Sequence, residues 1–85
     1  MILSWYHKAW AEYLEWQKED KKMLKKINSL IEDTLRNPTE GIGKPEPLKH
    51  ELSGVWSRRI DHEHRLVYVF TETTVTILSC KTHYQ

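Results

Sequence analysis

The residues of this chain best suited to chemistry are cations close to its C-terminal end. Arg59 and Arg65 flank the short segment Asp61-His62-Glu63. If that segment is a three-residue hairpin loop, Arg59 lies directly opposite Arg65, whereas a two-residue loop would put them on opposite faces. Like charges directly opposite each other destabilise a sheet, so such a pair needs a compensating group. An acidic neighbour would be a structural reason for it, and a bound phosphate would be a functional one.

A second hairpin would enlarge this cationic face. If Glu72-Thr73-Thr74 is also a three-residue loop, Lys81 falls opposite Arg65, and His83 lies just beyond on the same face. In that register the cationic face also carries Val67, Val69, Val75 and Ile77, and the other face carries Leu66, Tyr68, Phe70, Leu78 and Cys80. The sequence leaves both registers open. Strands that are apolar on both sides need cover on both sides, which predicts a protein partner, a homodimer contact, or both.

The elements that would position these residues form an α+β fold in the order β-α-α-β-β-β. A short strand over Ile2–Trp5 precedes helical spacing from about Tyr6, and Asp20 is a plausible N-cap of a second helix that Asn37-Pro38 ends. Segments 55–60, 64–71 and 75–81 are rich in β-branched and aromatic residues and predict a meander of antiparallel strands. Two apolar stripes predict the helical core: Trp10, Tyr13, Leu14 and Trp16, then Met23, Leu24, Ile27, Leu30 and Ile31. Both helices would lie on one face of the sheet.

The loop between the helices and the strands is stiff. Residues 37–47 contain all three prolines and two of the three glycines of the chain. Because proline fixes φ and disfavours helix before it, Pro45-Glu46-Pro47 is expected to be extended. Such a loop is suited to holding one side chain in place.

Composition excludes several classes of protein. Eighty-five residues predict one domain over 1–85, and 13 Lys+Arg against 12 Asp+Glu give +1, which excludes a histone-like polycation but not a local basic patch. The sequence has no long apolar run that would predict a membrane span, and no secretion signal is recognised. We therefore expect a cytoplasmic protein. The lone Cys80 is expected to be a small buried hydrophobe in a reducing compartment.

Several motifs, in order along the chain, resemble one known family. They are the run from Gly41 to His50, Leu52-Ser53-Gly54, Trp56-Ser57-Arg58-Arg59-Ile60, His64-Arg65-Leu66-Val67-Tyr68 and the ending His83-Tyr84. Together they resemble the YoeB/Txe toxins of the RelE superfamily, which belong to bacterial toxin–antitoxin systems. The resemblance covers essentially the whole chain and implies a small RelE-like fold.

The resemblance also implies an activity and a set of partners. The activity would be that of an endoribonuclease that cleaves messenger RNA in the A site of the 70S ribosome, and a cognate antitoxin of the YefM/Axe type would neutralise it. Carried over by matching position, Glu46 is the general base, His83 is the general acid and Arg65 stabilises the phosphate. The substrate-binding residues would be Lys49, Arg59, Tyr84 and Lys81. No metal and no other cofactor is implied.

Elementary chemistry agrees with those roles. RNA cleavage without a metal needs a base for the 2′-OH, an acid for the leaving 5′-oxygen and cations for the charge on the phosphate. Glu46, His83 and Arg65 supply one of each. A glutamate beside several cations stays ionised and is a weak base, so we expect the site to depend on the ribosome to orient the RNA.

Two rival interpretations remain. His62-x-His64 with His50 or His83 could ligate zinc, although histidine spacing of this kind is a weak signal. A second rival is a non-enzymatic toxin of the same fold that resembles the ParE group and acts on DNA gyrase by protein–protein contact, because fold does not fix function.

Overall fold

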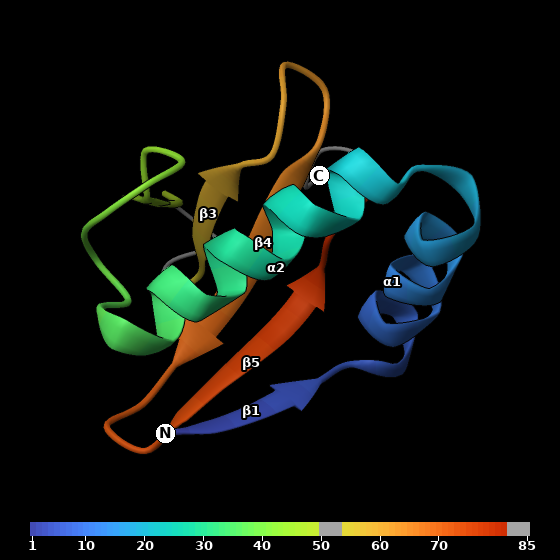
Figure 1. Cartoon of the computed structure of the whole chain (residues 1–85). Coiled ribbons are helices and arrows are strands. Elements are labelled where there is room, and N and C mark those ends of the chain that lie inside the picture. The colour runs from blue at the N-terminus through green and yellow to red at the C-terminus, as the bar shows by residue number, and fades with distance from the viewer. Residues whose placement is uncertain (50–53, 82–85) are drawn as a thin grey trace.

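The computed structural model describes residues 1–49 and 54–81. The chain forms β1 (Ile2–Trp5), α1 (His7–Glu19), α2 (Lys21–Arg36), β2 (Glu46–Pro47), β3 (Trp56–Arg59), β4 (Arg65–Phe70) and β5 (Thr74–Ser79). Both helices pack on one face of the sheet, and α2 crosses β4 and β5 (Figure 1). The predicted α+β architecture is therefore confirmed.

The sheet is mostly antiparallel, with strand order β1-β5-β4-β3-β2. The first strand is the exception, because β1 runs parallel to β5, with Leu3 opposite Val75. The short strand β2 lies in the segment predicted to be extended, and it pairs with β3 through Glu46 and Ser57. The loop that carries Glu46 is thus part of the sheet.

The two helices begin and end at the residues that the sequence indicates. The Asp20 carboxylate accepts hydrogen bonds from the N–H groups of Lys22 and Met23, so it caps the N-terminus of α2. The Asn37 N–H donates to the Asp33 carbonyl at the other end of this helix. The described residues contain no helix that is both long and apolar enough to cross a membrane.

The core lies between the helices and the sheet. Ile27, Leu30 and Ile31 of α2 are buried, as their helical spacing predicts. The prediction for α1 was partly wrong, because Trp10 and Leu14 are 42% and 41% exposed. This helix instead buries Ala9 and Trp16, and Trp10 stacks on Tyr13, with ring centroids 5.7 Å apart.

The second hairpin differs from its prediction. The Thr71 N–H donates to the Thr74 carbonyl at 2.8 Å, and Phe70 pairs with Val75, so the loop contains two residues instead of three. This places Val75 and Ile77 in the helix-side core, and their prediction for the opposite face was wrong.

A β-bulge then corrects the register. Tyr68 pairs with Ile77 but Val67 pairs with Ser79, so Leu78 is the extra residue. Beyond the bulge the strands follow the alignment that a three-residue loop would have given. Cys80 is consequently buried on the helix side, as predicted.

Candidate active site

The candidate site lies on the sheet face opposite the helices, which we call the far face. The strand registers show which residues share this face. Glu46 pairs with Ser57, Ser57 with Val67 and Val67 with Ser79, so these four residues form one line across the sheet. Directly paired residues point to the same side of a sheet. Glu46 therefore lies on the far face, and its side chain is exposed.

The two arginines of the site share that face. Arg59 is directly opposite Arg65 in the β3–β4 pair, which confirms the register that a three-residue loop predicts. Arg59 is exposed and Arg65 is half-buried. Arg65 Nη1 donates to the carbonyls of Asp61 and His64, at 2.7 Å and 3.1 Å, and these bonds hold its guanidinium group beside the turn.

The turn itself is held by Asp61. Its carboxylate accepts hydrogen bonds from the N–H groups of Glu63 and His64, at 2.8 Å and 2.6 Å. Partial burial acts to raise the pKa of the Asp61 carboxyl, but these two N–H groups and the nearby histidines outweigh it and lower the pKa. The ionised Asp61 thus fixes the loop that sets the arginine register.

No acidic side chain among residues 1–49 and 54–81 forms an ion pair with Arg59 or Arg65. In this part of the chain, the structural reason for two facing arginines is therefore missing. An oxyanion such as a phosphate would compensate both charges.

The other predicted residues are placed as follows. Lys49 follows β2 by two residues and is exposed, and the preceding Leu48 N–H donates to the Val55 carbonyl at 2.8 Å. His83 and Tyr84 lie outside the described residues.

Lys81 has partners on α1. Its Nζ lies 2.7 Å from Glu15 Oε1 and 3.2 Å from Glu19 Oε1, and it sits over the Trp16 ring, 4.9 Å from the centroid. The hydrogen bond to Glu15 is the main cause of a raised pKa of the Lys81 ammonium group. The ammonium group of Lys81 thus contacts α1 on the helix side, so its predicted place on the cationic face with Arg65 was wrong. Substrate binding by Lys81 stays a prediction.

The described part of the chain shows no cluster of metal ligands that would support the zinc hypothesis. Within residues 1–49 and 54–81, no three His, Cys, Asp or Glu side chains are grouped to hold a metal ion. His64 stands edge-on to Trp16, with ring centroids 4.9 Å apart. The His50 and His83 of that hypothesis lie outside the described residues.

Comparison with known proteins decides the family. Residues 5–84 match the model of the YoeB-like toxin of bacterial type II toxin-antitoxin systems. The chain belongs to this family. Toxin YoeB of Escherichia coli strain K12 is 58% identical over 84 residues, which are 99% of this chain and 100% of the relative.

Solved YoeB structures have the same fold. The YoeB dimer from Staphylococcus aureus superimposes with a TM-score of 0.91 at 49% identity, and the match covers 99% of this chain and 98% of that one. The heterotetrameric YoeB–YefM toxin–antitoxin complex from the same organism gives a TM-score of 0.90 at 49% identity, with the same coverage. The predicted RelE-like fold is thus confirmed by YoeB relatives.

Sequence reasoning missed one buried cation near the site. Arg58 precedes Arg59 in β3, pairs with Leu66 and is 0% exposed on the helix side. Strand alternation separates the two arginines, but the residues that Arg58 contacts are distant in sequence. They could not have been identified without the tertiary structure.

Proposed function

We propose that this chain is a ribosome-dependent endoribonuclease that cleaves messenger RNA in the ribosomal A site. The observation that carries the proposal is the far face itself, where Glu46, Arg59 and Arg65 lie together and no described acidic side chain pairs with the arginines. Membership of the YoeB-like toxin family supports the same function.

The proposed reaction is an internal transfer at the phosphate. Glu46 takes the proton of the 2′-OH, the 2′-oxygen forms a bond to phosphorus, and the bond from phosphorus to the 5′-oxygen breaks. His83 gives a proton to that leaving oxygen, so the products are a 2′,3′-cyclic phosphate and a 5′-hydroxyl. Arg65 stabilises the charge that develops on the phosphate oxygens.

The remaining candidates bind the substrate. Lys49, Arg59 and Lys81 would contact phosphates, and Tyr84 would help to position the RNA. Glu46 is exposed and a carboxylate is a weak base, so correct orientation of the 2′-OH by the ribosome would supply much of the rate. This predicts little cleavage of naked RNA.

The proposal includes partners and a compartment. A cognate antitoxin would bind and neutralise the chain, as the YoeB–YefM complex from Staphylococcus aureus suggests. A homodimer is a second proposed assembly, supported by the YoeB dimer from that organism. Action on translating ribosomes implies a cytoplasmic site of action.

Primer extension on a messenger RNA in translating ribosomes tests the function. The wild type should give discrete cuts within A-site codons, and Glu46→Gln or His83→Ala should lower the cleavage rate by about 10²-fold or more. Naked RNA and a gyrase supercoiling assay run in parallel. Full cleavage by Glu46→Gln would remove this residue from the role of base, and intact messenger with inhibited gyrase would favour the ParE-like alternative.

A further inference from the structure

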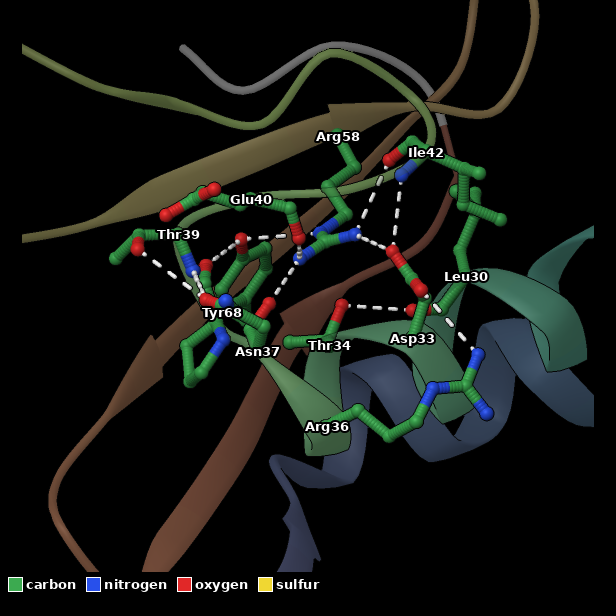
Figure 2. Close-up of polar contacts among 11 residues, drawn as sticks. Leu30, Asp33, Thr34, Arg36, Asn37, Thr39, Glu40, Ile42, Arg58 and Tyr68 are labelled. Atoms are coloured by element: carbon green, nitrogen blue, oxygen red, sulfur yellow. Dashed lines mark hydrogen bonds and ion pairs between the residues drawn. The ribbon is translucent and has the colours of Figure 1, made fainter.

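The buried Arg58 points into the loop that precedes Glu46. Its guanidinium group lies between β3, the end of α2 and residues 37–42 (Figure 2). A guanidinium group has five N–H donors in a fixed plane. All of them have acceptors here: Tyr68 Oη at 3.2 Å, Asp33 Oδ2 at 2.6 Å, and the carbonyls of Ile42, Asn37 and Glu40 at 3.1, 2.6 and 3.0 Å.

Two neighbours of Arg58 hold the same loop. Asp33 Oδ2 also accepts the Ile42 N–H at 2.9 Å, and the Tyr68 hydroxyl donates to the Pro38 carbonyl at 2.6 Å. We call Arg58, Asp33 and Tyr68 the loop clamp. The clamp binds backbone groups from one end of segment 37–42 to the other.

The clamp explains why a charged residue is buried here. A segment without regular secondary structure leaves its carbonyls in need of donors, and an unpaired buried carbonyl is destabilising. A guanidinium group can satisfy several carbonyls at once, which an aliphatic side chain or an ammonium group cannot do with the same geometry. Asp33 supplies the counter-charge, so the cation is not buried alone.

The position of the loop is transmitted to Glu46 through Gly43. The Gly43 carbonyl accepts the Arg59 N–H at 2.7 Å, and its φ of +78° suits glycine. A Cβ atom at this position would lie 2.7 Å from Leu30 Cδ2, so the backbone passes close to α2. Only Lys44 and the rigid Pro45 separate this anchor from Glu46.

We propose that Arg58 is the positioning residue for Glu46. It contacts the loop from the helix side of the sheet and thereby sets where the carboxylate stands relative to Arg59 and Arg65 on the far face. This inference rests on the proposed nuclease function. A small displacement of a catalytic group lowers the rate of the chemical step with little effect on substrate binding.

The test uses three variants of the full chain. Arg58→Lys keeps the charge but loses the planar fork, and Tyr68→Phe removes one hydroxyl from the clamp. Arg36→Gln is the matched control, because Arg36 also donates to Asp33, at 3.2 Å, but is 72% exposed and does not reach the loop. Urea denaturation first establishes that each variant is folded.

Single-turnover cleavage on translating ribosomes then separates rate from affinity. We expect the maximal rate to fall about 30–100-fold for Arg58→Lys and about 5–10-fold for Tyr68→Phe. The half-saturating toxin concentration should change less than about threefold, and Arg36→Gln should stay within about twofold of wild type in both. In amide spectra, Ile42 and Gly43 should shift in the two clamp variants more than in the control.

Each contrary result has a definite meaning. A folded Arg58→Lys that cleaves at the wild-type rate, or loses affinity alone, overturns the proposal. If Arg58→Lys does not fold, Tyr68→Phe decides in the same way. If the wild type cleaves no messenger, the proposed nuclease function fails and Glu46 needs no catalytic positioning. The amide spectra would then still show whether Arg58 holds the loop, and unchanged Ile42 and Gly43 signals would refute that contact as well.

Discussion

Arg59 of β3 lies directly opposite Arg65 of β4, so two positive charges face each other across neighbouring strands. The Asp61 turn fixes this register, because its carboxylate accepts the N–H groups of Glu63, in the three-residue loop, and of His64, directly after it. Repulsion between facing cations works against the fold. Among the residues that the structure describes, no acidic side chain offsets this repulsion, and the pair lies where the proposed function would bind an RNA phosphate.

Arg59→Ala should separate stability from activity. Removing one charge of the facing pair should leave the free energy of unfolding unchanged or raise it, by roughly 0.2–1 kcal/mol. The cleavage rate should fall about 10²-fold, because a phosphate contact is lost. Urea denaturation and primer extension on the same preparations measure the two effects.

Salt provides the control for Arg59→Ala. Any gain in stability should shrink at high ionic strength, since repulsion between exposed charges is screened. Arg36→Ala, which removes an exposed arginine that has an acidic partner, should show no gain. A clear loss of stability in Arg59→Ala would mean that Arg59 has a favourable partner in the folded chain.

The loss of folding stability at acidic pH should depend on Asp33. The Ile42 N–H, and then the Arg58 guanidinium group, hold the pKa of the Asp33 carboxyl below its ordinary value of 3.8. A carboxyl whose pKa is lowered in the folded state contributes its full stabilisation at pH values above its ordinary pKa of 3.8. This stabilisation is lost as the pH falls toward the folded-state pKa. Asp33→Asn should therefore be less stable than wild type at pH 6, and the difference should narrow below about pH 4.

Urea midpoints between pH 6 and pH 2.5 measure this dependence on Asp33. Glu32→Gln, at the exposed position next to Asp33 on α2, is the matched control and should follow the wild-type curve. A constant difference between Asp33→Asn and wild type across the whole range would show that Asp33 acts through packing and not through its charge.

Local chemistry made part of the site predictable. The arginine register follows from one loop of three residues, and Asp61 begins that loop with a side chain suited to a tight turn. The extended Pro45-Glu46-Pro47 follows from proline geometry, and the structure pairs it with β3 as β2. These features need only neighbours in sequence.

Other features depend on tertiary contacts that no short motif carries. The register of β5 required both a two-residue loop and a bulge at Leu78, and the sequence alone favoured neither. The partners of Arg58 come from α2, the loop and β4, and they meet only in the folded chain. The exposure of Trp10 likewise depends on which face of α1 packs on the sheet, since this helix buries Ala9 and Trp16 instead.

The residues that precede His83 are anchored to α1. Trp16 Nε1 donates to the Cys80 carbonyl at 2.9 Å, and Glu12 Oε1 accepts the Cys80 N–H at 2.8 Å. Trp16→Phe keeps an aromatic ring but leaves that buried carbonyl without its donor, which should lower the free energy of unfolding by about 1–3 kcal/mol. The maximal cleavage rate should also fall, by about tenfold, because His83 follows this anchor by three residues.

Trp10→Phe is the matched control for Trp16→Phe, since Trp10 lies on the same helix and is 42% exposed. It should change stability and cleavage much less. Both measurements are made at a temperature where each variant is fully folded, so that loss of folded protein does not contribute to the rate. Normal cleavage by a folded Trp16→Phe would exclude a role for this anchor in placing His83.

Cys80 should be inert toward thiol reagents in the folded chain. It is completely buried, and its Sγ donates a weak hydrogen bond to the Ala9 carbonyl at 3.7 Å. Burial, helped by the nearby Glu12 carboxylate, raises the pKa of the Cys80 thiol from 9.0 to about 12. Since the thiolate is the reactive form, alkylation by iodoacetamide at pH 8 should be about 10³-fold slower than in the unfolded chain. Mass spectrometry of alkylation in buffer and in denaturing urea measures the ratio, and rapid modification of the native protein would show that this part of the core opens readily.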